Sequence, residues 1–328
     1  MNGVSAAANS TPRDILVICG PTAAGKSAVA MWLAEQESTA IISADSRQVY
    51  KGFDIGTAKP THDEQRRVPH FGIDVADPTF RYSAAVWAES AVGWIDTICA
   101  QSRRPLVVGG TGLYLRALFE GLFEEPPLDA NARASLAEEL DRLELSELQR
   151  WTRALDPDRA HLGRTQLRRA IEIALLTGHR LSELHRERPA NARWGAGRGL
   201  RPRYLLVDAG PMLAPQISAR IDHMLNHGWP DEVRVLIQSV PESAPAWNAT
   251  GYDAIRRMLR GEIARENAHE IVLIATRQYA KRQRTWFRHQ LPAGAVTHLD
   301  STRDDWRDVA MRWARFATIE DGDGRRAL

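Results

Sequence analysis

The feature that most constrains the fold is an eight-residue run, Gly20-Pro21-Thr22-Ala23-Ala24-Gly25-Lys26-Ser27, which matches the pattern G-x-x-x-x-G-K-[ST]. An apolar run at 15–19 precedes it, and residues with helical spacing follow it. In such a strand, loop and helix, backbone N–H groups curl around phosphate oxygens and the helix N-terminus adds partial positive charge. Lys26 adds a full charge, and the Ser27 hydroxyl is the candidate Mg²⁺ ligand. The sequence therefore predicts a site for a polyphosphate or diphosphate.

The residues around this loop predict an α/β fold. Apolar runs at 40–43 and 105–108 are typical of buried strands, and a helix is expected over 83–100 between them. Strands that alternate with helices favour a parallel sheet with both faces covered. A further strand is expected at 204–207, followed by helices near 213–228, 231–239, 252–260 and 262–285. We predict a P-loop NTPase-like parallel sheet core.

A helical segment interrupts this core. A Pro-Pro pair at 126–127 ends the first part, and 129–187 has helical spacing with no strand-like run. A basic Gly/Pro/Arg loop follows at 188–202. We therefore expect a core of 14–121 and 203–316 and a small all-helical insertion domain at 122–202. The ends, 1–13 and 317–328, are expected to be a disordered lead-in and tail.

Composition excludes several classes of protein. The chain has 328 residues and no apolar run near the length of about 18 that a membrane span needs. Its start has neither the basic nor the apolar region of a signal peptide. Two cysteines are too few for a disulfide framework or a four-cysteine zinc site. We expect a cytoplasmic protein, a monomer, with no membrane partner.

Charge is unevenly distributed along the chain. Residues 1–164 carry 17 basic and 22 acidic side chains, a net −5, whereas 165–328 carry 26 and 19, a net +7. Two stretches of the basic half, 166–172 and 276–290, are rich in Arg and Lys, and the second interleaves them with aromatic residues. This mixture suits RNA, where phosphates are neutralised and bases stack on rings. An ordinary solvated helix face would have the same pattern, so both interpretations stay open.

Two polar residues at expected strand ends are candidates for the chemistry. Asp45 follows the second strand and faces the phosphate loop in a parallel sheet. It could serve as a general base, as a carboxylate in the outer shell of Mg²⁺, or as a helix cap. The third strand runs into Gly109-Gly110-Thr111-Gly112 without the carboxylate typical of hydrolytic motors. Thr111 could bind a ligand or cap the next helix. His223 and His227 have metal-ligand spacing but no third ligand nearby, which favours surface histidines.

These motifs together resemble the bacterial tRNA dimethylallyltransferases over about residues 14–300. The resemblance rests on GPTAAGKS, SADSRQVYKGFDIGTAKP, PLVVGGTGLYLRAL, QLRRAIE and AKRQRTWFR, in that order. It implies transfer of a dimethylallyl group from dimethylallyl diphosphate to N6 of the adenosine 3′ to the anticodon (position 37), in tRNAs that read codons beginning with U. It also implies Mg²⁺ as cofactor and the tRNA anticodon stem-loop as partner.

Carried over residue by residue, the resemblance assigns roles. Residues 20–27 would cradle the diphosphate, Asp45 would be the general base, Thr111 would lie beside the adenine, and Arg220 would hold the diphosphate. The segments similar to the family's tRNA contacts contain Asp45, Ser46, Arg47, Gln48, Thr111, Arg133, Gln166, Leu167, Arg168, Arg169, Lys281, Arg282, Gln283, Arg284 and Arg288.

The sequence departs from the family at two positions and leaves two alternatives. Gln216 stands at a position where relatives often have an arginine. Asp253 follows Gly-Tyr, at a position where some relatives have an arginine. A P-loop kinase for a small molecule or nucleotide would share the phosphate loop but would not explain the basic stretches. An RNA-binding switch would bind RNA without covalent change and would not need Asp45.

Overall fold

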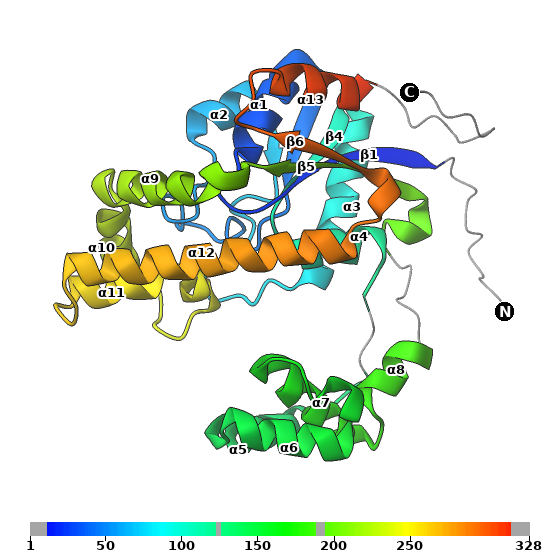
Figure 1. The fold of residues 1–328 in the computed structure, drawn as a ribbon, viewed down its shortest axis with the longest axis vertical. Helices are drawn as coiled ribbons and strands as arrows, with labels where there is room; N and C mark the ends of the chain where they lie inside the picture. Colours follow the sequence, from blue (N-terminus) through cyan, green and yellow to red (C-terminus); the bar gives the residue numbers. More distant parts are fainter. Residues whose placement is uncertain (1–11, 123–125, 188–193, 316–328) are drawn as a thin grey trace. The chain divides into compact units, whose positions relative to one another are not determined.

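A computed structural model describes residues 12–122, 126–187 and 194–315 of the chain (Figure 1). It forms two compact units, 1–119 with 194–328 and 120–193. Most of the expected lead-in and all of the expected tail lie outside the described residues. No helix in the described part of the chain is long and apolar enough to cross a membrane.

The first unit is built on a six-stranded, fully parallel sheet with the order β3-β2-β4-β1-β5-β6. Its strands are β1 (Arg13–Cys19), β2 (Thr39–Ser43), β3 (His70–Phe71), β4 (Arg104–Gly109), β5 (Leu200–Asp208) and β6 (Val296–Asp300). The inner strands are almost wholly buried, which explains their continuous apolar runs. The predicted α/β fold is confirmed. The edge strands β3 and β6 were missed because they are short, partly exposed and contain histidine.

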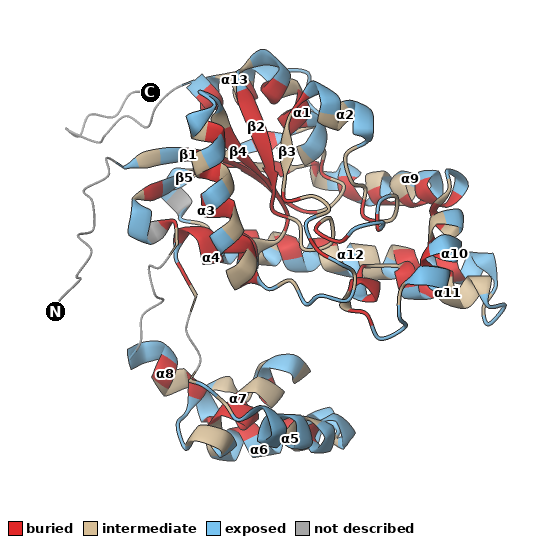
Figure 2. Cartoon of the chain, turned by 180° about the vertical axis from the view of Figure 1, so that it is seen from behind, coloured by how far each residue is buried: buried red, intermediate tan, exposed pale blue. Residues whose placement is uncertain are grey.

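Helices cover the sheet in pairs. In Figure 1, α1 (Lys26–Gln36) and α13 (Trp306–Arg315) lie on one side of it, and α3 (Ala84–Ala100) and α4 (Gly112–Phe119) on the other. The rings of Trp32 and Trp306 meet edge-on at 5.2 Å between α1 and α13. This layering places the buried core within and beside the sheet (Figure 2).

A second set of helices lies beyond the carboxyl ends of the strands, where ligands bind in such folds. It comprises α2 (His62–Arg67), α9 (Leu213–Asn226), α10 (Trp229–Ser239), α11 (Tyr252–Leu259) and α12 (Arg265–Gln290). The 26-residue α12 packs against α9 and α11 and reaches α4. Helix α12 starts and ends a few residues later in the chain than the predicted range of 262–285.

The second unit is all-helical, as predicted. It contains α5 (Ala130–Arg142), α6 (Leu145–Leu155), α7 (Arg164–Thr177) and α8 (Leu181–Glu187) around a small core. The unit ends at 193, not at 202, because Gly195 packs against the backbone of Leu118 and β5 already begins at Leu200. On α7, Ile173 packs with Leu181 and Leu184, whereas Leu175 is 45% exposed.

Candidate active site

The phosphate loop, residues 20–27, has the conformation that its glycines allow. Gly20 has φ +146° and Gly25 has φ +86°, both in the range that favours glycine. A Cβ on Gly20 would lie 2.1 Å from the carbonyl oxygen of Val207. Helix α1 begins at Lys26 without a side-chain cap, so its first N–H groups remain open to an anion. The predicted strand, loop and helix are confirmed.

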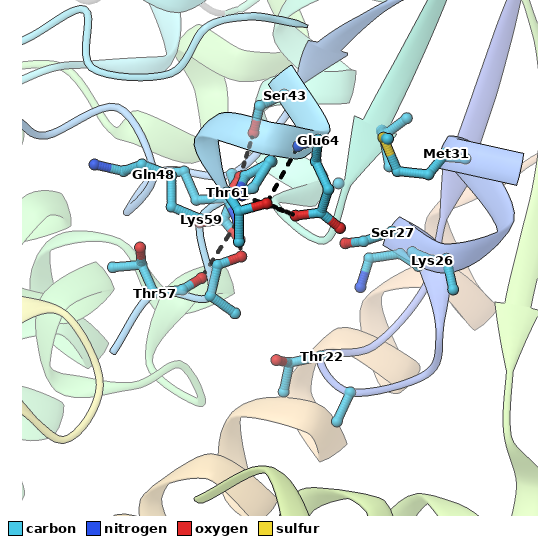
Figure 3. A pocket seen from close by; sticks show the side chains of 18 of the residues that line it. Thr22, Lys26, Ser27, Met31, Ser43, Gln48, Thr57, Lys59, Thr61 and Glu64 are labelled. Carbon is cyan, nitrogen blue, oxygen red and sulfur yellow. Dashed lines mark hydrogen bonds between the residues drawn. The ribbon is translucent and has the colours of Figure 1, made fainter. Parts of the chain in front are cut away.

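A cavity of about 680 Å³, here called the large cavity, opens over this loop. Figure 3 shows Lys26 and Ser27 pointing into it from one wall, with Thr61 and Glu64 on the wall opposite. Thr61 and Glu64 form a capping box at the start of α2 and so fix that wall. Helix α9 and the residue that follows it close another side with several polar side chains, namely Gln216, Arg220, His223 and, after the helix, His227.

Two of the cations that line this cavity, Lys26 and Arg220, lie at the phosphate loop. Lys26 Nζ donates to the carbonyl of Pro21 at 2.6 Å, and Nη1 of Arg220 lies 3.4 Å from Thr22 Oγ1. Burial lowers the pKa of Lys26, opposed by the charge of Asp45 and assisted by that of Arg220, with a net value of about 8. Burial also lowers the pKa of Arg220, again opposed by Asp45. The pair is therefore poorly solvated, and an anion would relieve its mutual repulsion.

Asp45 lies at the carboxyl end of β2, beside this pair. Its Oδ1 accepts from the N–H of Arg47 at 2.9 Å, which makes a turn and leaves Oδ2 for a ligand. The helix-cap interpretation of Asp45 is wrong, because no helix starts here; the next helix in the described chain begins at His62. The interpretation as a base and the one as a metal-shell carboxylate both remain compatible with this position.

Thr111 connects the loop after β4 to the loop of Asp45. Its Oγ1 accepts from the N–H of Ser46 at 3.1 Å, and its own N–H donates to the carbonyl of Ala44 at 3.1 Å. A Cβ on Gly109 would lie 2.1 Å from that same carbonyl oxygen, so the glycine permits this approach. Thr111 thereby holds the loop that carries Asp45 in place.

Helix α12 supplies two residues whose roles the sequence analysis missed. Gln283 is 6% exposed, and its Oε1 accepts from the N–H of Thr22 at 2.8 Å while its Nε2 donates to the carbonyl of Gly110 at 2.9 Å. Both ends of this amide are therefore engaged within the chain, where they brace the phosphate loop against the loop of Thr111. Tyr279, one turn earlier, hydrogen-bonds with Thr111, and burial followed by the charge of Asp45 raises its pKa to about 12. Tyr279 and Gln283 are spaced i, i+4, which places them on one face of a helix, and this spacing was the signal in the sequence that could have grouped them.

The four basic residues of α12 that the resemblance assigns to tRNA divide into two groups. Lys281, Arg282 and Arg288 are exposed, and the Arg282 guanidinium lies 5.9 Å from the centre of the Tyr279 ring. Arg284 instead binds both carboxylate oxygens of Asp208, with its Nε 2.9 Å from Oδ2, and donates to the carbonyl of Gly210. Arg284 therefore ties α12 to the end of β5, and the exposed basic groups are accessible to a phosphate backbone.

Several predicted tRNA residues are already engaged within the chain. The Gln48 amide donates to the carbonyls of Thr57 and Ala58 and accepts from Ser43. In the helical unit, Leu167 is fully buried in the core, so its assignment to tRNA binding was wrong. The exposed Gln166 accepts from the N–H of Gly163 at 3.1 Å.

The arginines of the helical unit are paired with acids. Arg168 pairs with Asp141, and Glu172, which is nearly buried, accepts from Arg133 at 3.2 Å and from Arg169 at 3.0 Å. Such pairs orient a guanidinium without removing its remaining donors.

Three or more metal-ligating side chains do not come together anywhere in the described residues. His223 and His227 stack at 3.9 Å between ring centres and are exposed, as predicted.

Comparison with known proteins decides the family. Residues 48–290 match the model of the IPP transferase family. The chain belongs to this family. Residues 13–71 also match a model described as isopentenyl transferase. Both descriptions are of group transfer, and neither is of a kinase.

Relatives of the family are similar along most of the chain. A tRNA dimethylallyltransferase of Cyanothece sp. is 39% identical over 281 residues, covering 84% of this chain and 89% of the relative. One of Geobacter metallireducens is 39% identical over 284 residues with the same coverage. The solved structure of a tRNA delta(2)-isopentenylpyrophosphate transferase from Staphylococcus epidermidis has a TM-score of 0.63 at 29% identity, covering 93% of this chain and 98% of that one. The family resemblance drawn from the motifs is thereby confirmed.

Proposed function

We propose that this protein transfers a dimethylallyl group from dimethylallyl diphosphate to N6 of the adenosine that follows the anticodon in tRNA. The observation that carries the proposal is the shared cavity of the phosphate loop, Lys26, Arg220 and Asp45. Two cations that would bind a diphosphate thus lie beside a carboxylate that would accept a proton. Membership of the IPP transferase family and the names of its relatives support the same reaction.

Each residue would have one task in this reaction. The bond between the allylic carbon and the diphosphate oxygen breaks, and its electron pair leaves with the diphosphate, stabilised by Lys26 and Arg220. The bond between N6 and that carbon forms as Asp45 takes the N6 proton. Thr111 would orient the adenine beside Asp45. Because the site lies within the protein, the adenosine must leave its stack to reach it.

The loop also fits Mg²⁺. Ser27 is exposed at the start of α1 and points into the large cavity (Figure 3). Mg²⁺ that is bound with phosphates usually keeps several waters and takes few protein ligands. One serine hydroxyl is therefore sufficient as the protein ligand of the ion. When bound, the ion would neutralise charge on the leaving diphosphate. Ser27 would hold it, and Lys26 would bind the diphosphate oxygens beside it.

Binding of tRNA would rest on the exposed groups Lys281, Arg282 and Arg288 of α12. They lie on the helix that also carries Tyr279, which lies beside Asp45 and Thr111. Phosphate contacts there would bring a tRNA loop to the cavity. We further propose that the protein acts as a monomer in the cytoplasm.

Donor binding is expected to weaken above about pH 8. The pKa of Lys26 is lowered to about 8, so its charged form, which binds the diphosphate, is lost as the pH rises through that value. The KM for dimethylallyl diphosphate should therefore rise between pH 7 and 9. In Lys26→Arg the guanidinium stays charged, so the rise should be much smaller. An equal rise in both proteins would contradict this role of Lys26.

Salt dependence of tRNA binding tests the surface of α12. Replacing Lys281, Arg282 and Arg288 by Gln should reduce the slope of log K against log salt by about 0.7–0.9 for each phosphate that the variant no longer neutralises. Arg312→Gln, an exposed arginine on α13, is the matched control and should leave the slope unchanged. An unchanged slope in the triple variant would mean that these side chains face water in the complex.

Diphosphate release tests the reaction itself. Inorganic diphosphate should appear only when dimethylallyl diphosphate and tRNA are both present. Formation of ADP and of a phosphorylated small acceptor from ATP, with no release of diphosphate, would instead indicate the kinase. Tight tRNA binding with no released product would indicate the RNA-binding switch.

A further inference from the structure

Lys59 is a further lysine in the wall of the large cavity. Figure 3 shows it beside Gln48 and Thr57, across the cavity from Lys26. Its side chain is 3% exposed, although it ends in an ammonium group. A lysine at this place would ordinarily be assigned to the diphosphate, but its contacts indicate another role.

All three donors of this ammonium group are used within the chain. Lys59 Nζ donates to the carbonyl of Tyr50 at 2.8 Å, to Oδ1 of Asp54 at 2.5 Å and to Oδ1 of Asp74 at 2.6 Å. A lysine has three donors and no acceptor, so no donor is left for a phosphate oxygen. Among the described residues, Lys26 Nζ donates to a single carbonyl oxygen, which leaves two donors for a ligand.

We infer that Lys59 is a positioning residue, which fixes the loop at 54–58 and through it the turn that carries Asp45, and that it does not bind the diphosphate. This inference rests on the proposed function. The loop at 54–58 is here called the roof loop. Four of its residues line the large cavity, so its conformation shapes the site; they are Asp54, Ile55, Thr57 and Ala58.

Lys59 joins three parts of the chain. Tyr50 follows β2, Asp54 begins the roof loop, and Asp74 follows β3. The first and third of these parts run side by side, since a parallel bridge joins Tyr50 to Ala76. Lys59 also neutralises two carboxylates that would repel each other in its absence. Its removal would therefore release the roof loop from both neighbouring segments.

A carboxylate on α10 holds the same loop. Glu232 accepts from the N–H groups of Asp54 at 3.0 Å and Ile55 at 2.6 Å, and from the hydroxyl of Tyr252 at 2.6 Å. Glu232 does not line the large cavity. Asp54 is therefore held through its N–H group by Glu232 and through its carboxylate by Lys59, and the roof loop has little freedom to shift.

Gln48 connects the roof loop to the strand that leads to Asp45. Its Nε2 donates to the carbonyls of Thr57 at 3.3 Å and Ala58 at 3.0 Å, and its Oε1 accepts from Ser43 Oγ at 2.8 Å. Ser43 is the last residue of β2 and stands two positions before Asp45. A shift of the roof loop would therefore disturb the end of β2 and the position of the Asp45 carboxylate.

The test compares Lys59→Met with Lys26→Met. Two quantities are measured, namely kcat for transfer in single turnovers and the Kd of inorganic diphosphate by calorimetry. We expect Lys59→Met to lower kcat about 10–10²-fold, because a displacement of about 1 Å at a reacting group can cost that much. The same variant should change the Kd of diphosphate less than about threefold, whereas Lys26→Met should raise it about tenfold or more, as expected when a charged hydrogen bond is lost.

Asp74→Asn supplies a readout that a lysine bound to the diphosphate would not give. In Lys59→Met two carboxylates face each other without a cation, and Asp74→Asn in the same chain removes one of the two charges. The double variant should therefore regain part of the lost kcat. If Lys59→Met does not fold, Asp74→Asn alone, which weakens the pairing at a side chain that is 41% exposed, should lower kcat with an unchanged Kd of diphosphate.

Lys51→Met is the matched control, since Lys51 is exposed and does not line the large cavity, and it should leave both quantities unchanged. A Kd of diphosphate that rises as much in Lys59→Met as in Lys26→Met overturns the inference. So does a double variant that regains no kcat, or wild-type kcat in every Lys59 and Asp74 variant that folds. Absence of transfer by the wild-type protein, with inorganic diphosphate still bound, would instead overturn the proposed function, and the inference with it.

Discussion

Asp45→Asn is expected to lower kcat by about 10²–10⁴-fold, the contribution usual for a general base. The amide has nearly the shape of the carboxylate and can still accept from the N–H of Arg47, so the turn should survive. It cannot take the N6 proton as the bond forms. The KM for dimethylallyl diphosphate should change little, because Lys26 and Arg220 still bind the diphosphate. Single-turnover transfer to unmodified tRNA measures the effect.

The matched control for Asp45 is Asp222→Asn. Asp222 lies on α9, the helix of Arg220, but is exposed and pairs with His269. It should retain wild-type kcat. A loss in Asp45→Asn that appears only as a raised KM for the donor would contradict the role as base and favour the carboxylate of the metal shell.

Lys26→Met is expected to lower kcat/KM for the donor by about 10²–10³-fold, the range seen when one preorganised group that stabilises developing charge is removed. Methionine keeps most of the length of the side chain and removes its charge. The loop should keep its conformation, since Gln283 and the glycines hold it independently of the lysine. Initial rates at several donor concentrations give the value.

Lys51→Met is the control for the lysine, because Lys51 is exposed in a turn after β2 and does not line the large cavity. It should behave as wild type. Equal losses in both variants would mean that a general charge effect, and not a diphosphate contact, governs the rate.

The features that depend on a local sequence pattern could be predicted from the sequence. The phosphate loop could be predicted because its strand, glycines and helix are contiguous, and Asp45 because parallel strands end at one edge of the sheet. What could not be predicted depended on contacts across the fold. In the sequence, Gln283 is one more polar residue in a basic stretch. Its role comes from a hydrogen bond with Thr22, which lies 261 positions away in the chain.

The same reason explains the remaining errors. Leu167 was included in a tRNA segment because it stands among basic residues, although its helical position places it in the core of its unit. A pattern of charge predicts the chemistry of a surface, but packing decides which side chains reach it.

The most direct test of the proposed reaction is the mass of one nucleoside. Unmodified tRNA with adenosine after its anticodon is incubated with the protein, Mg²⁺ and dimethylallyl diphosphate, then digested and analysed by mass spectrometry. The account predicts that this adenosine alone gains one five-carbon isoprene unit, and that the gain disappears with Asp45→Asn. An unchanged nucleoside, with tRNA bound and donor intact, would contradict it.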